Sequence, residues 1–281
     1  MNGTSGTVRR TGLSAPRRNR FFHGKMMDVH HFELETDYGI GMRRLLNRLV
    51  TGSGVVCGLD VEAGNDGCSV EVTAGVAIDR WGREMVVPAR TASIPIPPVL
   101  VERVCGRTEE RGEGGAYGGA RAEPDQREAR RSGYEPKPQE EAWVTVTLCY
   151  HECETDPVAV LAGDCSTSTP CAPGAIREQY RIAFEPGRAE APDLSCRFPD
   201  VLAHGELDYG ALARWITRDC PGLPRNPCIP LANVRLDCDP DHCSIDDIDI
   251  TIRPVVFGND ILVDILSRIV DEGRSDKNYE R

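Results

Sequence analysis

Residues 21–88 constrain the fold of this chain most, because they combine one amphipathic helix with several short strands in a short stretch. Apolar residues recur at steps of three and four from residue 30 to residue 50, and Asp28 precedes them as a helix cap. Alternating apolar residues between Gly-bearing turns predict strands over 55–61, 69–73, 75–79 and 84–87, the last two as a hairpin. This pattern favours a module that docks onto another protein over an enzyme.

Composition divides the rest of the chain. Residues 1–20 carry five Arg and no acidic residue, which predicts a disordered basic arm. Residues 21–104 are the helix-plus-β docking module, and residues 105–141 are rich in Gly, Pro and charges of both signs, which predicts a disordered insertion. Residues 142–281 are expected to form a Cys-rich mixed β domain with a C-terminal helix. The predicted fold class is strand-rich α+β, with small β-modules between an N-terminal amphipathic helix and a C-terminal helix.

Later elements follow the same patterns. Strands are expected over 143–150, 176–184 and 229–236, a short helix over 209–217, and the terminal amphipathic helix over 260–270. The Asp-rich stretch 237–249 lacks the Gly and terminal Glu of a calcium loop, and is expected to be a solvated acidic loop.

Charge and hydropathy narrow the function classes. The chain has 33 Lys and Arg against 44 Asp and Glu, a net charge of −11, which argues against nucleic acid as a partner. No run of eighteen apolar residues occurs, so no membrane span is expected. The first residues lack the apolar core of a secretory signal, so disulfides made by the secretion route are not expected.

Twelve cysteines suggest metal binding or cross-linking. His151, Cys153, Cys165 and Cys171 place four soft ligands within a short segment, a set that suits tetrahedral zinc. The segment has no Cys-x-x-Cys pair, so buried thiols or a loop-closing disulfide remain as alternatives.

A second group comprises Cys220, Cys228, Cys238 and Cys243, with His242 beside them. Its spacings are irregular, so the group is consistent with a metal site, with disulfides or with free thiols. A staple between Cys220 and Cys228 would close a Pro-rich loop that has little core of its own.

Known catalytic signatures are missing from the sequence. There is no Gly-x-Ser-x-Gly, no phosphate-binding Gly-Lys-Ser/Thr loop and no His-Glu-x-x-His. We therefore expect no enzyme activity and assign no catalytic or cofactor-binding residue.

Several short motifs together resemble a family of bacterial proteins associated with phage tails and phage-tail-like contractile injection particles. They are Phe21–Met27, Phe32–Glu35 with Tyr38, Arg44–Arg48, Gly54–Leu59, Gly75–Asp79, Gly82–Glu84, Glu152–Val158, Ile176–Glu178 and Arg253–Phe257. The match spans most of the chain outside 1–20 and 106–141.

The resemblance implies a structural component of a baseplate, a tail-fibre base or an accessory layer. Its partners would be other particle subunits and further copies of itself in a symmetric assembly. The chain would reside in the bacterial cytoplasm during assembly, or outside the cell as part of a released particle. The alternatives are a metal- or disulfide-stabilised binding module for surface carbohydrate and, third in order, a particle-borne hydrolase.

Overall fold

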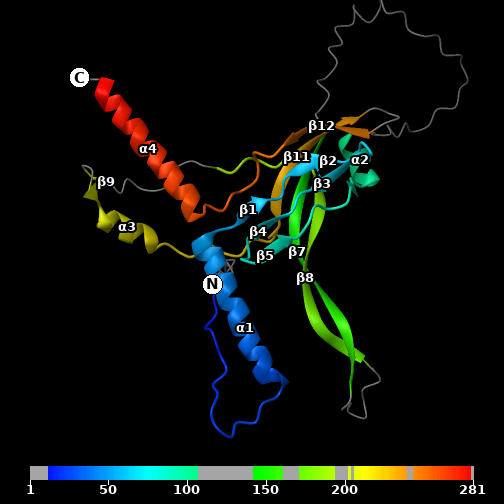
Figure 1. Ribbon diagram of the computed structural model, residues 1–281, viewed down its shortest axis with the longest axis vertical. Coiled ribbons are helices and arrows are strands. Elements are labelled where there is room, and N and C mark those ends of the chain that lie inside the picture. Colours follow the sequence, from blue (N-terminus) through cyan, green and yellow to red (C-terminus); the bar gives the residue numbers. More distant parts are fainter. Residues whose placement is uncertain are drawn as a thin grey trace, which may run out of the picture.

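The computed structural model describes residues 12–106, 142–160, 171–193, 202–203, 206–238 and 243–279. A β body lies at the centre, and several elements project from it (Figure 1). The helices are α1 (Val29–Leu46), which continues as the π-helical turn η1 (Asn47–Thr51), then α2 (Pro98–Val104), α3 (Tyr209–Ile216) and α4 (Asn259–Tyr279). The predicted strand-rich α+β class, with a helix near each end, is confirmed.

The strands pair in antiparallel sheets. One sheet has the order β1 (Gly54–Gly58), β4 (Gly75–Ile78), β5 (Glu84–Val87), and a second has β2 (Val61–Ala63), β3 (Ser69–Val72), β6 (Ile94–Pro95). The largest has the order β12 (Cys243–Asp249), β11 (Ile229–Cys238), β7 (Ala142–Ala159), β8 (Cys171–Pro186). Two short strands, β9 (Leu202–Ala203) and β10 (Glu206–Leu207), pair separately.

One hydrophobic cluster joins the two small sheets to the large sheet. Val70, Val72 and Met85 of the small sheets pack in the same cluster as Val144 and Val234 of the large sheet. The first half of β7, residues 142–149, is buried on both faces, and its Thr145 and Thr147 hydroxyls donate hydrogen bonds to Asn233 Oδ1 and the Ala183 carbonyl. The core therefore crosses the boundary expected between the docking module and the Cys-rich domain.

Several predicted elements are found at the expected places, and some differ. The hairpin of β4 and β5 and the strand β11 match the prediction. β7 continues well beyond Tyr150, where the predicted strand ends, and β8 begins before Ile176. The two strands pair along nearly their whole length as one long ribbon. The acidic stretch was wrongly expected to be a loop, since Asp246, Asp247 and Asp249 lie in β12. Residues 1–11 and nearly all of the insertion lie outside the described residues.

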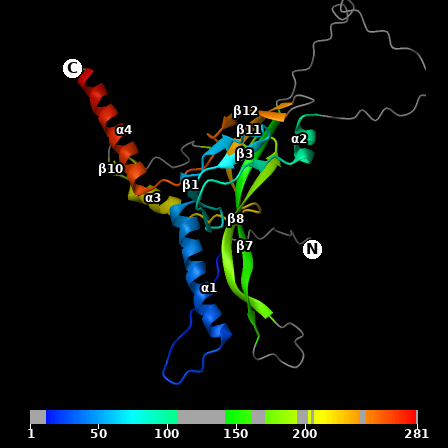
Figure 2. The same ribbon diagram turned by 45° about the vertical axis from the view of Figure 1, so that its right-hand side comes forward.

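Several elements lie away from the body, α3 among them (Figure 1). α1 and the distal part of the β7–β8 ribbon leave it in the same general direction, and α4 leaves it on the other side (Figures 1 and 2). Among the described residues, no helix has the length and apolar character needed to cross a membrane.

Candidate assembly interface

The free end of α1 carries an exposed apolar surface. Phe21, Phe22, Met26, Val29 and Phe32, which we term the apolar tip, have 62% to 87% of their surface exposed. α1 itself contains no buried residue. An ordinary surface helix buries one apolar face against its own core, so α1 has an apolar surface that the described chain does not cover.

Local interactions order this end of α1 even though it is exposed. Asp28 caps the helix by accepting a hydrogen bond from the backbone N–H of His31 at 3.1 Å. The segment before the helix folds back along it, where the backbone N–H of buried Asn19 donates to Glu35 Oε2 at 3.1 Å. The side chain of Lys25 also donates to the carbonyl of Arg20 at 3.2 Å. The apolar tip is therefore a shaped surface on a capped helix.

The base of α1 is fixed by a cluster of charged and aromatic side chains. We term Arg44, Asp79, Arg83, Tyr150 and Glu152 the arginine hub. The Arg44 guanidinium lies 3.3 Å from Glu152 Oε1 and 5.6 Å from the centre of the Tyr150 ring. The Arg83 guanidinium lies 4.4 Å from the centre of the same ring. The hub thus links α1, the β4–β5 turn and β7 through ion pairs and cation–π contacts.

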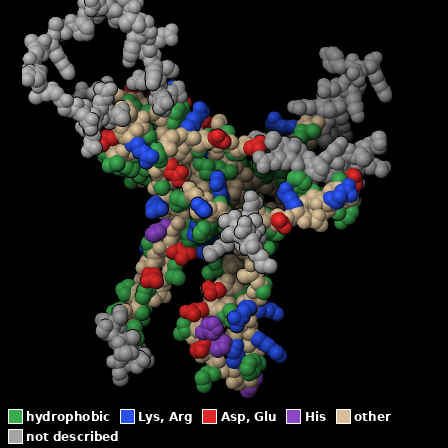
Figure 3. Space-filling model, turned by 180° about the vertical axis from the view of Figure 1, so that it is seen from behind, with side chains coloured by type: hydrophobic (Ala, Val, Ile, Leu, Met, Phe, Trp, Pro, Cys, Tyr) green, Lys and Arg blue, Asp and Glu red, His purple; other side chains and the backbone are tan. Residues whose placement is uncertain are grey.

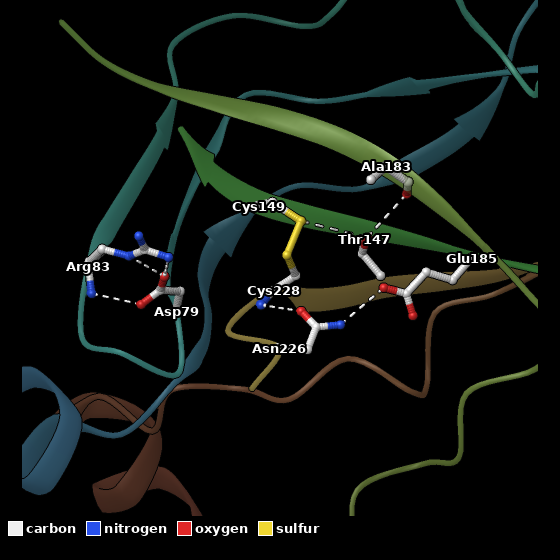
Figure 4. The surroundings of a disulfide bond; sticks show 8 residues. All are labelled: Asp79, Arg83, Thr147, Cys149, Ala183, Glu185, Asn226 and Cys228. Carbon is white, nitrogen blue, oxygen red and sulfur yellow. Dashed lines mark hydrogen bonds and ion pairs between the residues drawn. A yellow bond between two sulfur atoms is a disulfide. The ribbon is translucent and has the colours of Figure 1, made fainter. Parts of the chain in front are cut away.

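The β4–β5 turn supplies the buried part of the hub. Asp79 is completely buried, and its carboxylate accepts hydrogen bonds from the Arg83 side chain at 2.6 and 2.7 Å (Figure 4). It also accepts the backbone N–H groups of Trp81 at 2.8 Å and Arg83 at 2.9 Å. A buried carboxylate of this kind needs its cation, since an unpaired charge in a protein interior is strongly unfavourable.

Gly82 lets α1 approach this turn. Its φ of +84° lies in the region that favours glycine, and a Cβ there would stand 2.0 Å from the carbonyl oxygen of Arg44. Because the helix and the turn lie this close, the side chain of Asn47 can donate hydrogen bonds to the carbonyl of Gly82 at 3.0 Å and to Glu84 Oε1 at 2.8 Å. The turn and the helix base therefore fit only because residue 82 has no side chain.

The hub shifts the protonation of two of its members. The hydroxyl of Tyr150 donates to Glu152 Oε1 at 2.7 Å, and this bond, with help from Arg44, lowers the pKa of Glu152 below its ordinary value. Partial burial, followed by the neighbouring carboxylates, raises the pKa of Tyr150. At neutral pH the pair is therefore a neutral phenol bonded to a carboxylate, which suits a structural joint.

The distal β7–β8 ribbon is the second projecting element. From His151 to Ala159 and from Cys171 to Gln179 its side chains are exposed or at most half-buried. Seen from behind, this ribbon and α1 form separate limbs below the body, and both show hydrophobic side chains on the surface (Figure 3). A two-stranded ribbon alone is marginally stable in water, so this one is suited to being covered by a partner.

α4 is the third. Its apolar residues recur at helical spacing, yet those whose side chains the structure describes, up to residue 269, are at least 40% exposed. They are Ile261, Leu262, Val263, Ile265, Leu266 and Ile269.

The first predicted metal set is not brought together. Cys153 Sγ lies 3.2 Å from His151 Nε2 in β7. Cys171, by contrast, pairs with Ala159 in the ladder, which puts it about 20 Å from Cys153 at ~3.3 Å per residue. Cys165 lies outside the described residues.

The second set is divided among disulfides. Cys228 is bonded to Cys149, Cys238 to Cys105 and Cys243 to Cys68. Of the alternatives left open by the sequence, a Cys220–Cys228 staple is not formed, because Cys228 has its partner in β7 (Figure 4). Cys220 is free and exposed. With these pairings, the part of the chain that the structure describes holds no group of three or more His, Cys, Asp or Glu side chains ready for a metal, and His242 lies outside that part.

Some residues of the interface were not identified from sequence. Arg44 and Arg83 lie in the sequence motifs, but Tyr150 does not, although its ring lies against both guanidinium groups. The available signal was the Tyr-x-Glu spacing at the end of β7, which places both side chains on one face of a strand. Cys68, Cys105 and Cys149 carried no local signal, because their partners are remote in sequence.

Comparison with known proteins gives little guidance. No protein-family model matches the chain, and no curated protein matches it. Among solved structures it is similar to a crystal structure of TssK, with a TM-score of 0.34 and 11% sequence identity. The match covers 83% of this chain and 41% of that one, so this chain spans less than half the length of TssK. A likeness this distant assigns neither fold nor function.

Proposed function

We propose that the chain is a structural subunit of a contractile, phage-tail-like injection particle, and that it docks to another subunit through the apolar tip of α1. The apolar tip carries the proposal, because Val29 and Phe32 at the start of α1, and three large apolar side chains in the segment just before it, are all exposed. Large apolar side chains exposed together in one short segment are typical of protein interaction sites. The tip also lies in the segment whose motifs resemble proteins of such particles.

The arginine hub supports a docking role. It fixes the base of α1 to the β body through Arg44, Arg83 and Glu152. A binding surface that is held in position before contact loses less conformational entropy when it binds. The hub therefore presents the apolar tip at a defined distance from the body.

The finer assignments rest on the resemblance. The subunit would belong to the baseplate, a fibre base or an accessory layer, and would repeat with the symmetry of the particle. The exposed stripe that contains Ile261, Ile265 and Ile269 of α4 suits self-association between copies. The chain would be made in the bacterial cytoplasm and would leave the cell with a released particle. We assign it no catalytic residue.

The test is incorporation into particles. A tagged chain carrying Phe22→Ser and Phe32→Ser is expressed in cells that make the particle, and the particles are sedimented. We expect the double variant to be lost from the particle fraction, because the substitutions remove apolar contact area while leaving the hub intact. The control is Glu33→Ser, which changes an exposed residue on the same helix and should incorporate normally.

Equal incorporation of the double variant and the wild type would contradict docking through the tip. Deletion of residues 1–100 would be a poorer test. It would remove Val70, Val72 and Met85 from the shared core and Cys68 from its disulfide, so loss of incorporation would report only unfolding.

A further inference from the structure

Four cysteines from three separate segments meet at one end of the β body. Cys238 ends β11 and Cys243 begins β12, and the two are direct partners across the hairpin. Cys243 is joined to Cys68, just before β3, with a Cα–Cα distance of 5.3 Å. Cys238 is joined to Cys105, just after α2, with a Cα–Cα distance of 5.5 Å. Figures 1 and 2 show β12, β3 and α2 together at this end.

These residues, which we term the cysteine quartet, form one cluster. Opposite residues of an antiparallel pair point to the same face, with Cβ atoms about 4.5–5.5 Å apart. The path from Cys68 to Cys243, Cys238 and Cys105 therefore consists of three short steps. All four residues are also partly buried against the same hydrophobic core.

We propose that the reduced cysteine quartet binds one zinc ion, and that the two disulfides are the oxidised form of the same site. Four Cys ligands in a tetrahedron, with Zn–S of about 2.3 Å and hence sulfurs about 3.8 Å apart, make a common structural zinc site. Four residues separate Cys238 from Cys243, which is within the spacing of paired zinc ligands.

The exchange between the two forms balances with a dithiol as reductant. Two dithiol molecules supply four electrons and four protons, break both S–S bonds and become cyclic disulfides themselves. The four thiols then lose four protons as their thiolates bind Zn²⁺. In the reverse direction, two molecules of a small disulfide accept the four electrons, the two protein disulfides form again and Zn²⁺ leaves.

The site would link the same segments of the chain under reducing and under oxidising conditions. Cys68 and Cys105 belong to the early part of the chain, whereas Cys238 and Cys243 belong to the large sheet. Zinc would link them in a reducing cytosol, where disulfides do not persist, and disulfides would link them after release. The Cys149–Cys228 disulfide involves only two cysteines, so its reduction should not create a four-thiolate zinc site, and it serves as a control within the same chain.

The test is a cobalt and zinc titration of the full chain after anaerobic reduction with a dithiol and removal of the reductant. We expect about one Co²⁺ per chain, with the thiolate-to-cobalt charge-transfer band and the visible bands of a tetrahedral four-thiolate site, displaced by Zn²⁺. The air-oxidised chain should lose this binding, and peptide mapping should recover the Cys68–Cys243 and Cys105–Cys238 cross-links.

Variants identify the ligands. Cys68→Ser and Cys238→Ser should each lose the four-thiolate spectrum, whereas Cys57→Ser and Cys149→Ser should keep it. The titration of the reduced wild-type chain decides the question even where a variant fails to fold. Absence of stoichiometric metal in that chain, or an unchanged spectrum in both Cys68→Ser and Cys238→Ser, would overturn the proposal.

Discussion

At the scale of single residues, the β4–β5 turn depends on how Asp79 is held. Its carboxylate is fully buried and is balanced by the Arg83 guanidinium at 2.6 Å. The same guanidinium lies against the rings of Trp81, at 4.7 Å, and Tyr150, at 4.4 Å. Arg83 therefore neutralises a buried charge and also attaches the turn to β7.

We expect Arg83→Ala to lower the free energy of unfolding by about 3–5 kcal/mol, because it leaves the Asp79 carboxylate buried without its cation. Denaturant unfolding of the oxidised chain measures this. Arg80→Ala is the matched control, since Arg80 is exposed on the same turn and contacts Pro227 only through its backbone N–H. That variant should stay within about 0.5 kcal/mol of the wild type. Equal effects of the two substitutions would contradict the structural role of Arg83.

At the scale of elements, α1 is attached to the body mainly at its base. Arg43 pairs with Glu84 at 2.8 Å, and Arg48 donates to the carbonyl of Pro221 at 2.9 Å. The close approach of Gly82 to the Arg44 carbonyl brings these contacts within reach. The orientation of the helix therefore depends on a glycine at position 82 of the β4–β5 turn.

We expect Gly82→Ala to release α1 from the body, because the new Cβ would overlap the Arg44 carbonyl. Hydrogen exchange over residues 43–50 should speed up. Gly187→Ala is the matched control, since Gly187 has a similar φ of +91° but no atom within 4 Å of the added Cβ. The control substitution should lower the free energy of unfolding only by the backbone strain, about 1–2 kcal/mol, and should leave hydrogen exchange in α1 unchanged. Unchanged exchange in Gly82→Ala would show that the helix base is held by other contacts.

Sequence reasoning found the elements whose periodicity is regular and failed where it is broken. α1 and the β4–β5 hairpin follow clear helical and alternating patterns. β12 does not, because Ile245 and Ile248 are three positions apart, and an irregularity in its pairing with β11 accompanies the packing of both against the core. Its acidic residues then suggested a loop.

The cysteine pairings could not be read from spacing for a different reason. Cys228 has Cys220 nearby in sequence, but it bonds to Cys149, 79 residues away, because β7 and β11 are neighbours in the sheet. The quartet likewise depends on how β11 and β12 pack against β3 and α2. Such contacts are properties of the tertiary fold, and cysteine counting alone does not determine them.

At the scale of the whole molecule, a well-packed β body contrasts with projecting elements that have little core. Leu148, Leu231 and Val234 are completely buried in the body. The apolar tip, the distal ribbon and the stripe of α4 are exposed. Exposing this much apolar surface is unfavourable for an isolated chain, and the cost is removed if partners cover it. We therefore infer that the complete structural unit is the assembly.

The most direct measurement of this claim is hydrogen exchange on the isolated chain and on the same chain within purified particles. We predict that exchange slows on assembly in residues 21–35 and in the distal β7–β8 ribbon, while β11 stays equally protected in both. Unchanged exchange in residues 21–35 within particles would contradict docking through the apolar tip. Absence of the chain from the particles would contradict the proposed function as a whole.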